Sequence, residues 1–140
     1  MSNDEKKKYL RRYMNLYNDN IVIAQRIESL RETCQSAKTQ KLTGMPGAHN
    51  HTDLSDYAVR VDELLMLASK KREELIRVRQ EVEECIESLS EEAESALIFY
   101  RYIMLMSWED ISKKMGYSIR HVIRLHGEAL YNLKISQKKH

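Results

Sequence analysis

The sequence has 140 residues, a formal net charge of +2, 42% hydrophobic residues and 31% charged residues, which fits a soluble chain of one domain or two small ones. No stretch approaches the 18 uncharged apolar residues of a membrane span, and the basic residues 1–13 are not followed by the apolar segment of a secretory signal. We therefore expect a cytoplasmic protein with no membrane partner. One proline and four glycines leave long runs without a helix breaker, which favours an all-α fold.

A heptad-like seam runs through residues 9–34, where apolar residues alternate at steps of four and three with one polar break at Asn20. Its members are Tyr9, Tyr13, Leu16, Asn20, Ile23, Ile27, Leu30 and Cys34. The spacing predicts one amphipathic helix over about residues 4–36. Two readings of Asn20 stay open: it fixes the register of a helical dimer, as single buried asparagines can, or it faces solvent at a helix bend.

Residues 39–53, TQKLTGMPGAHNHTD, predict a loop because they contain the only proline and two of the four glycines. Thr52 or Asp53 is a suitable cap for the helix that follows. That helix is predicted over about residues 53–88 by a second seam with one charged member, Lys71. The seam consists of Val61, Leu64, Ala68, Lys71, Leu75, Val78, Val82, Cys85 and Leu89.

Two helices that each carry one apolar stripe must hide those stripes, so residues 1–88 predict a long antiparallel helical hairpin that is coiled-coil-like. A lone hairpin has a thin core, which favours a partner chain or packing on the C-terminal part. Cys34 and Cys85 have no CxxC partner, and we expect both to be buried free thiols in a reducing compartment.

Residues 89–140 predict three shorter helices with recognisable ends. Ser90 is a candidate cap for a helix over about 91–104, whose inner face is Ala93, Ala96, Leu97, Tyr100 and Ile103 or Met104. Ser107 caps a short helix that ends at Gly116 in the left-handed conformation. Ser118 then caps the last helix, over about 119–135.

The spacing of this last block predicts a helix-turn-helix. The face of its first helix is Trp108, Ile111 and Met115, and we expect Trp108 and Tyr117 to be core residues. The break at residues 116–118 is followed by a second apolar face at steps of three and four, formed by Val122, Leu125, Ala129 and Leu133.

The opposite face of the last helix holds the candidate site, because the N-terminal residues of such a helix meet base edges in the major groove. That face reads Ile119, Arg120, Ile123, Arg124 and Gly127, with His121 and His126 flanking it. Arginine can bond guanine and isoleucine can pack on a thymine methyl, while Gly127 can permit close approach to a phosphate or another helix. Lysines nearby and at the C-terminal end are candidates for phosphate contacts. The predicted DNA-binding set is Lys113, Lys114, Ser118, Ile119, Arg120, His121, Ile123, Arg124 and Lys134, with Lys138 and Lys139 as further candidates. Ile119 and Ile123 fit a protein-docking patch as the alternative.

The segment SWEDISKKMGYSIRHVIRLHGEALYNLK resembles region 4 of sigma factors, which reads promoter −35 elements. The resembling parts are the Trp-acid-acid-Ile start, the Gly-Tyr-Ser turn, the Val122 to Leu125 step, the Glu128–Leu130 segment with Leu133-Lys134, and Arg101-Tyr102 upstream. The whole chain is similar to small phage and prophage proteins of the RinA and ArpU type, suspected regulators of late-gene transcription with a helical N-terminal part. The base-reading positions of region 4 fall on Ile119, Arg120, Ile123 and Arg124. Sigma factors often place charged residues at the two positions that hold isoleucine here, so no −35-type consensus site is expected.

These observations predict a sequence-specific double-stranded DNA-binding protein that regulates transcription, assembled as a homodimer, with RNA polymerase contact implied by the resemblance alone. Two alternatives stay open: a small terminase-like DNA-packaging subunit, and a protein that binds polymerase or sigma without DNA. No catalytic set, phosphate loop or metal cage is recognisable, so we expect no enzyme activity and no cofactor. His49, His51 and Asp53 are read as solvated loop residues rather than a metal site. The seven glutamates in residues 81–94 are read as a solvated helix face, or as an acidic side that repels DNA or meets a basic partner.

Overall fold

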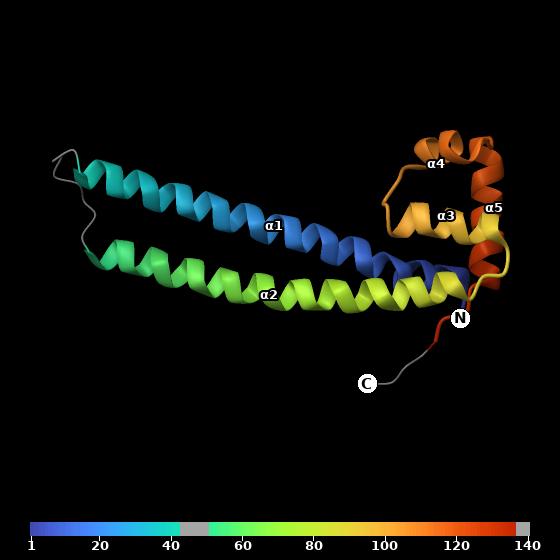
Figure 1. The fold of residues 1–140 in the computed structure, drawn as a ribbon, viewed down its shortest axis with the longest axis horizontal. Coiled ribbons are helices and arrows are strands. Elements are labelled where there is room, and N and C mark those ends of the chain that lie inside the picture. Colours follow the sequence, from blue (N-terminus) through green and yellow to red (C-terminus); the bar gives the residue numbers. More distant parts are fainter. Residues whose placement is uncertain (43–50, 137–140) are drawn as a thin grey trace. The chain divides into compact units, whose positions relative to one another are not determined.

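The structure is a computed structural model that describes the backbone of residues 1–42 and 51–136 and the side chains of residues 1–38 and 54–136. The described residues form five helices and no strand (Figure 1). The helices are α1 (Asn3–Leu42), α2 (His51–Glu87), α3 (Glu92–Tyr102), α4 (Trp108–Met115) and α5 (Ile119–Asn132). The prediction of an all-α fold is confirmed. None of these helices combines the length and the apolar composition needed to cross a bilayer.

The two long helices extend further than their seams predicted. Residues 39–42 continue α1 and residues 51–53 belong to α2, so the predicted loop over 39–53 is too long. The reason is local, because the first strong helix breaker after the α1 seam is Gly44 and none follows Gly47 before α2 begins. Thr52 and Asp53 therefore lie inside α2 instead of capping it. Residues 43–50 lie outside the described residues.

The chain divides into two compact units, and each helix of the long pair contributes to both. The first unit joins Met1–Leu16 with Leu75–His140, and the second is Tyr17–Glu74. The domain boundary predicted between residues 88 and 89 falls inside the first unit.

The second unit has a small core that follows the predicted seams. Ile23 and Ile27 of α1 are buried with Leu64 of α2, and Leu30 and Ala68 pack beside them. The polar break in the first seam meets the charged break in the second, because Nδ2 of Asn20 donates to the carbonyl oxygen of Lys71 at 3.3 Å. Asn20 is half-buried, so the solvent-facing reading of this residue is wrong.

The first unit has the larger core, to which α1, α2, α3 and α5 all contribute. Its buried residues are Leu10, Tyr13, Val78, Val82, Cys85, Ile86, Leu89, Ile98, Tyr102, Ile103, Ala129, Leu130 and Leu133. Leu10 is fully buried although it lies off the predicted seam, because in this unit α1 is also covered by residues of the C-terminal helices. Both cysteines are free thiols, as predicted. Cys85 is buried, as expected, but Cys34 is only half-buried.

The start of α1 holds the end of α5. Nζ of Lys6 donates to the carbonyl oxygens of Leu130 at 2.8 Å, Tyr131 at 3.2 Å and Leu133 at 2.8 Å. Nδ2 of Asn3 donates to the carbonyl oxygen of Gly127 at 3.3 Å. The last carbonyls of a helix have no partner within it, and a lysine is a favourable cap for the negative end of the helix dipole.

The acidic run of residues 81–94 is not a uniform solvated face. Glu94 is buried, and its carboxylate accepts from Nδ2 of Asn132 at 2.7 and 3.1 Å. Glu81 pairs with Arg12 at 2.6 Å. The predicted cap of α3 is wrong, because Glu91 occupies the cap position without a side-chain bond and Ser90 lies before it. α3 also ends at Tyr102, two residues before the predicted end.

Candidate functional site

Three helix caps that the sequence predicted fix both ends of α4 and the start of α5. Oγ of Ser107 accepts from the backbone N–H of Asp110 at 3.1 Å at the start of α4. Gly116 ends α4 in the left-handed conformation, with φ 73° and ψ 25°. Oγ of Ser118 accepts from the backbone N–H of His121 at 3.1 Å at the start of α5. These caps set where each helix begins and ends, so the direction of α5 relative to α4 follows from the turn.

One face of α5 is held against α3 and α4. Leu97 of α3, Ile111 of α4 and Val122 of α5 are each fully buried in one cluster. Partly buried apolar side chains surround these three residues: Tyr100, Met106, Trp108, Met115 and Leu125. Figure 1 shows α4 passing directly into α5, with α3 beside them. The predicted apolar faces of both helices are therefore the buried ones.

The opposite face of α5 is exposed at its N-terminal half. Ile119 and Ile123 are 42% and 50% exposed, and Arg120 and Arg124 are exposed beside them. Two large apolar side chains and two arginines therefore share the exposed face of α5.

The lysines of the predicted set lie at two different places. Lys113 and Lys114 are exposed in the last turn of α4, next to the turn that leads into α5. Lys134 lies beyond the far end of α5, roughly 20 Å from Arg120 by helix rise, and its backbone N–H donates to Oγ of Ser88 at 3.0 Å. The α4 lysines therefore lie close in sequence to the turn that precedes the arginines, and Lys134 lies apart. Lys138 and Lys139 lie outside the described residues.

The sequence assigned Tyr117 to the core, but in the structure this residue belongs to the exposed surface. It is 38% exposed, and its ring centroid lies 4.5 Å from that of His121. The Nδ1 atom of His121 in turn lies 3.3 Å from the Nη2 atom of Arg124. The core prediction is wrong because Tyr117 belongs to the turn, outside both apolar faces. The three side chains form a row along the first turns of α5, which we call the Tyr117–Arg124 row.

His126 was predicted to flank the exposed face, and this is wrong because the residue is 5% exposed. Its Nε2 lies 2.7 Å from Oη of Tyr102, and its ring meets the edge of Trp108 at a centroid distance of 4.8 Å. Burial lowers the pKa of His126 from 6.5 to about 4, and Lys7 and the arginines 101 and 11 act in the same direction. The signal was present in the sequence, since residue 126 follows Val122 by four positions and shares its face.

Gly127 does not serve a close approach within the described structure. A Cβ placed on it would have no heavy atom within 4 Å.

The exposed face of α5 has the electrostatic character of an anion-binding surface. The first turn of α5 contains no acidic residue, and the free N–H groups of a helix start carry partial positive charge. Among the described residues, no carboxylate forms an ion pair with Arg120, Arg124, Lys113 or Lys114. These cations remain available to an external anion.

No metal site is present among the described side chains, where no three His, Cys, Asp or Glu residues come together. The side chains of His49, His51 and Asp53 lie outside the described residues. Comparisons with family models, with curated proteins and with solved structures find no match to this chain.

Proposed function

We propose that this protein binds double-stranded DNA through the exposed N-terminal half of α5 and regulates transcription. The observation that carries the proposal is the pairing of two faces on one short helix. One face is fixed by the buried cluster of Leu97, Ile111 and Val122, and the other presents Arg120 and Arg124 without carboxylate partners. A reading helix needs both properties, because it must be rigid and must offer donors to base edges.

In this proposal α4 and α5 act as a helix-turn-helix, and α5 enters the major groove. Arg120 and Arg124 contact base edges, since arginine can donate two hydrogen bonds to guanine. Ile119 and Ile123 contact thymine methyl groups, which gives their exposure a use. Ser118 and the lysines of α4 contact phosphates and position the helix.

The Tyr117–Arg124 row extends the proposal beyond the sequence-predicted set. The ring of Tyr117 restricts His121, and His121 lies within hydrogen-bond distance of Arg124. A side chain that is already ordered loses less conformational entropy when it binds. We therefore assign Tyr117 and His121 to positioning Arg124.

We further propose that residues 1–88 form an antiparallel helical hairpin that assembles the protein as a homodimer in the cytoplasm. A dimer would place two reading helices on half-sites about 34 Å apart, one helical turn of DNA. The resemblance to sigma region 4 and to the RinA and ArpU type supports regulation of late phage or prophage genes, with RNA polymerase as a further partner.

The test begins with selection of bound sequences from a random duplex library, followed by fluorescence anisotropy on the selected duplex and on a scrambled one. Arg124→Ala should weaken binding to the selected duplex by about 1–3 kcal/mol, roughly 5- to 150-fold, and should narrow the difference between the two duplexes. Arg77→Ala is the matched control, because Arg77 is an exposed arginine of α2. It should bind both duplexes like the wild type.

A second variant separates base contacts from phosphate contacts. Lys113→Ala should weaken binding to both duplexes equally and reduce the slope of log K against log salt by about one. If Arg124→Ala discriminates between the duplexes as well as the wild type does, α5 does not read bases. If lowering the salt concentration does not strengthen the binding of the wild type to either duplex, the protein is not a DNA-binding protein.

A further inference from the structure

A pocket away from the exposed face of α5 is lined by residues of α1, α3 and the segment after α3. Its volume is about 390 Å³, and its lining residues are Arg11, Met14, Asn15, Arg101, Tyr102 and Leu105. We call it the basic pocket. It lies entirely within the first compact unit. Small-molecule sites commonly have volumes of about 300–1,000 Å³, with mostly apolar walls and a few placed polar groups, and this lining fits that description.

The two arginines of the basic pocket have no carboxylate partner among the described residues. Arg101 is held in place, because its Nη1 donates to the carbonyl oxygen of Met106 at 2.9 Å and its guanidinium lies 4.1 Å from the centroid of the Trp108 ring. Arg11 is exposed on α1 and can move towards a ligand.

The surroundings of the pocket are electropositive enough to act on neighbouring groups. Burial and the charge of Arg11 both lower the pKa of Arg101. Lys7 and both arginines favour the neutral form of the buried His126. An anion in the pocket would relieve this repulsion, since opposite charges stabilise one another most where water is partly excluded.

We infer that the basic pocket binds a phosphate-bearing organic anion about the size of a mononucleotide. The guanidinium groups of Arg11 and Arg101 match the geometry of phosphate oxygens, and Asn15 adds an amide. Met14 and Leu105 provide apolar contact for the body of the ligand. This inference does not depend on DNA binding by α5.

The pocket also touches the helix of the proposed function through one residue. Tyr102 lines the pocket, and its Oη lies 2.7 Å from Nε2 of His126 on α5. A ligand that packs on Tyr102 is therefore one contact away from α5.

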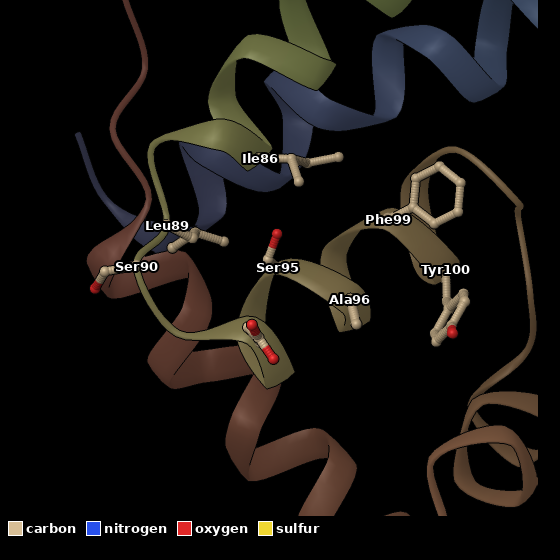
Figure 2. Close-up of a pocket in the computed structure, with 8 residues that line it drawn as sticks. Ile86, Leu89, Ser90, Ser95, Ala96, Phe99 and Tyr100 are labelled. Atoms are coloured by element: carbon tan, nitrogen blue, oxygen red, sulfur yellow. The ribbon is translucent and has the colours of Figure 1, made fainter.

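A second groove of this unit lacks the features that carry the inference. Figure 2 shows this groove, which is lined by the end of α2, the segment after it and α3. It has a similar volume of about 400 Å³, and its lining residues are Ile86, Leu89, Ser90, Glu92, Ser95, Ala96, Phe99 and Tyr100. Its single charged group is a carboxylate, so it offers no ligand to a phosphate.

Isothermal titration calorimetry of the full chain, with AMP and separately with inorganic phosphate, tests the inference. AMP should bind more tightly than inorganic phosphate, because only AMP has a body that can contact the apolar walls. Arg11→Gln should weaken AMP binding about tenfold or more, the usual consequence of losing a hydrogen bond to a charged group. Arg72→Gln, at an exposed arginine of the second unit, should bind AMP like the wild type.

Arg11→Gln is the main variant because Arg11 is exposed and its side chain forms no hydrogen bond or ion pair with the described residues, and circular dichroism verifies its fold. Asn15→Ala is the second variant and should weaken the binding of AMP severalfold. A competition arm identifies the natural source of the phosphate. Displacement of AMP by duplex DNA from the wild type identifies the source as a DNA backbone, and the absence of displacement identifies a free anion. The inference is overturned if neither AMP nor phosphate binds, or if Arg11→Gln and Arg72→Gln bind AMP equally.

Discussion

Acidification should destabilise the first unit through one buried imidazole. His126 is 5% exposed between Tyr102 and Trp108, and its pKa is lowered from 6.5 to about 4. Between these two values the unfolded chain binds a proton that the folded chain does not. The stabilising contribution is therefore fully present above pH 6.5 and is lost as the pH falls towards 4.

The size of the effect follows from the two pKa values. Each pKa unit corresponds to about 1.4 kcal/mol, so the complete loss is roughly 3 kcal/mol. About 2 kcal/mol of this is lost between pH 7 and pH 5, before most carboxylates titrate. A loss of this size is large for a unit whose total stability is of the order of 5–15 kcal/mol.

Urea denaturation followed by circular dichroism at pH 7, 6 and 5 measures the effect. His126→Gln keeps a polar group near Oη of Tyr102 but cannot titrate, so its free energy of unfolding should change with pH by much less than that of the wild type. His121→Gln, the same replacement on the outer side of α5, should retain the loss seen in the wild type. The reasoning fails if His126→Gln loses as much stability between pH 7 and pH 5 as the wild type does.

Two further variants test the frame that holds α5. Gly116→Ala should lower the free energy of unfolding by about 1–2 kcal/mol in a urea titration, because its φ of 73° is left-handed while its Cβ would meet no other atom; an unchanged midpoint would contradict the conformational explanation. Lys6→Met should lower the free energy of unfolding by about 1–2 kcal/mol and speed hydrogen exchange in the last turn of α5, since three carbonyl oxygens lose a charged donor. Lys8→Met, at an exposed lysine of the same helix, is the control and should change neither quantity.

The parts of the structure that the sequence predicted are those that depend on near neighbours. Ser107, Gly116 and Ser118 end or begin helices through bonds to residues three or four positions away, so a short motif contains all the required information. The same holds for the apolar faces represented by Ile111 and Val122, because a helical period is a local property.

Other errors concern residues whose surroundings come from distant segments. Glu94 is buried because Asn132 reaches it, and no rule about acidic runs identifies that partner. Leu10 is buried because α5 and α3 residues share its cluster, which a two-helix seam does not include. The basic pocket was not predicted for the same reason, since Arg11 and Arg101 are 90 positions apart in the sequence and meet only after folding.

The amine of Lys6 and the carbonyl of Leu130 that it contacts are separated by 124 positions. During translation, residues 1–16 leave the ribosome before α5 is synthesised. The apolar side chains of Leu10 and Tyr13 therefore stay exposed until the residues that bury them are made. Closure of such a long stretch of chain is entropically slow. We therefore expect folding of this unit to finish only after α5 has left the ribosome, at a rate sensitive to chaperones that shield Leu10 and Tyr13 until then.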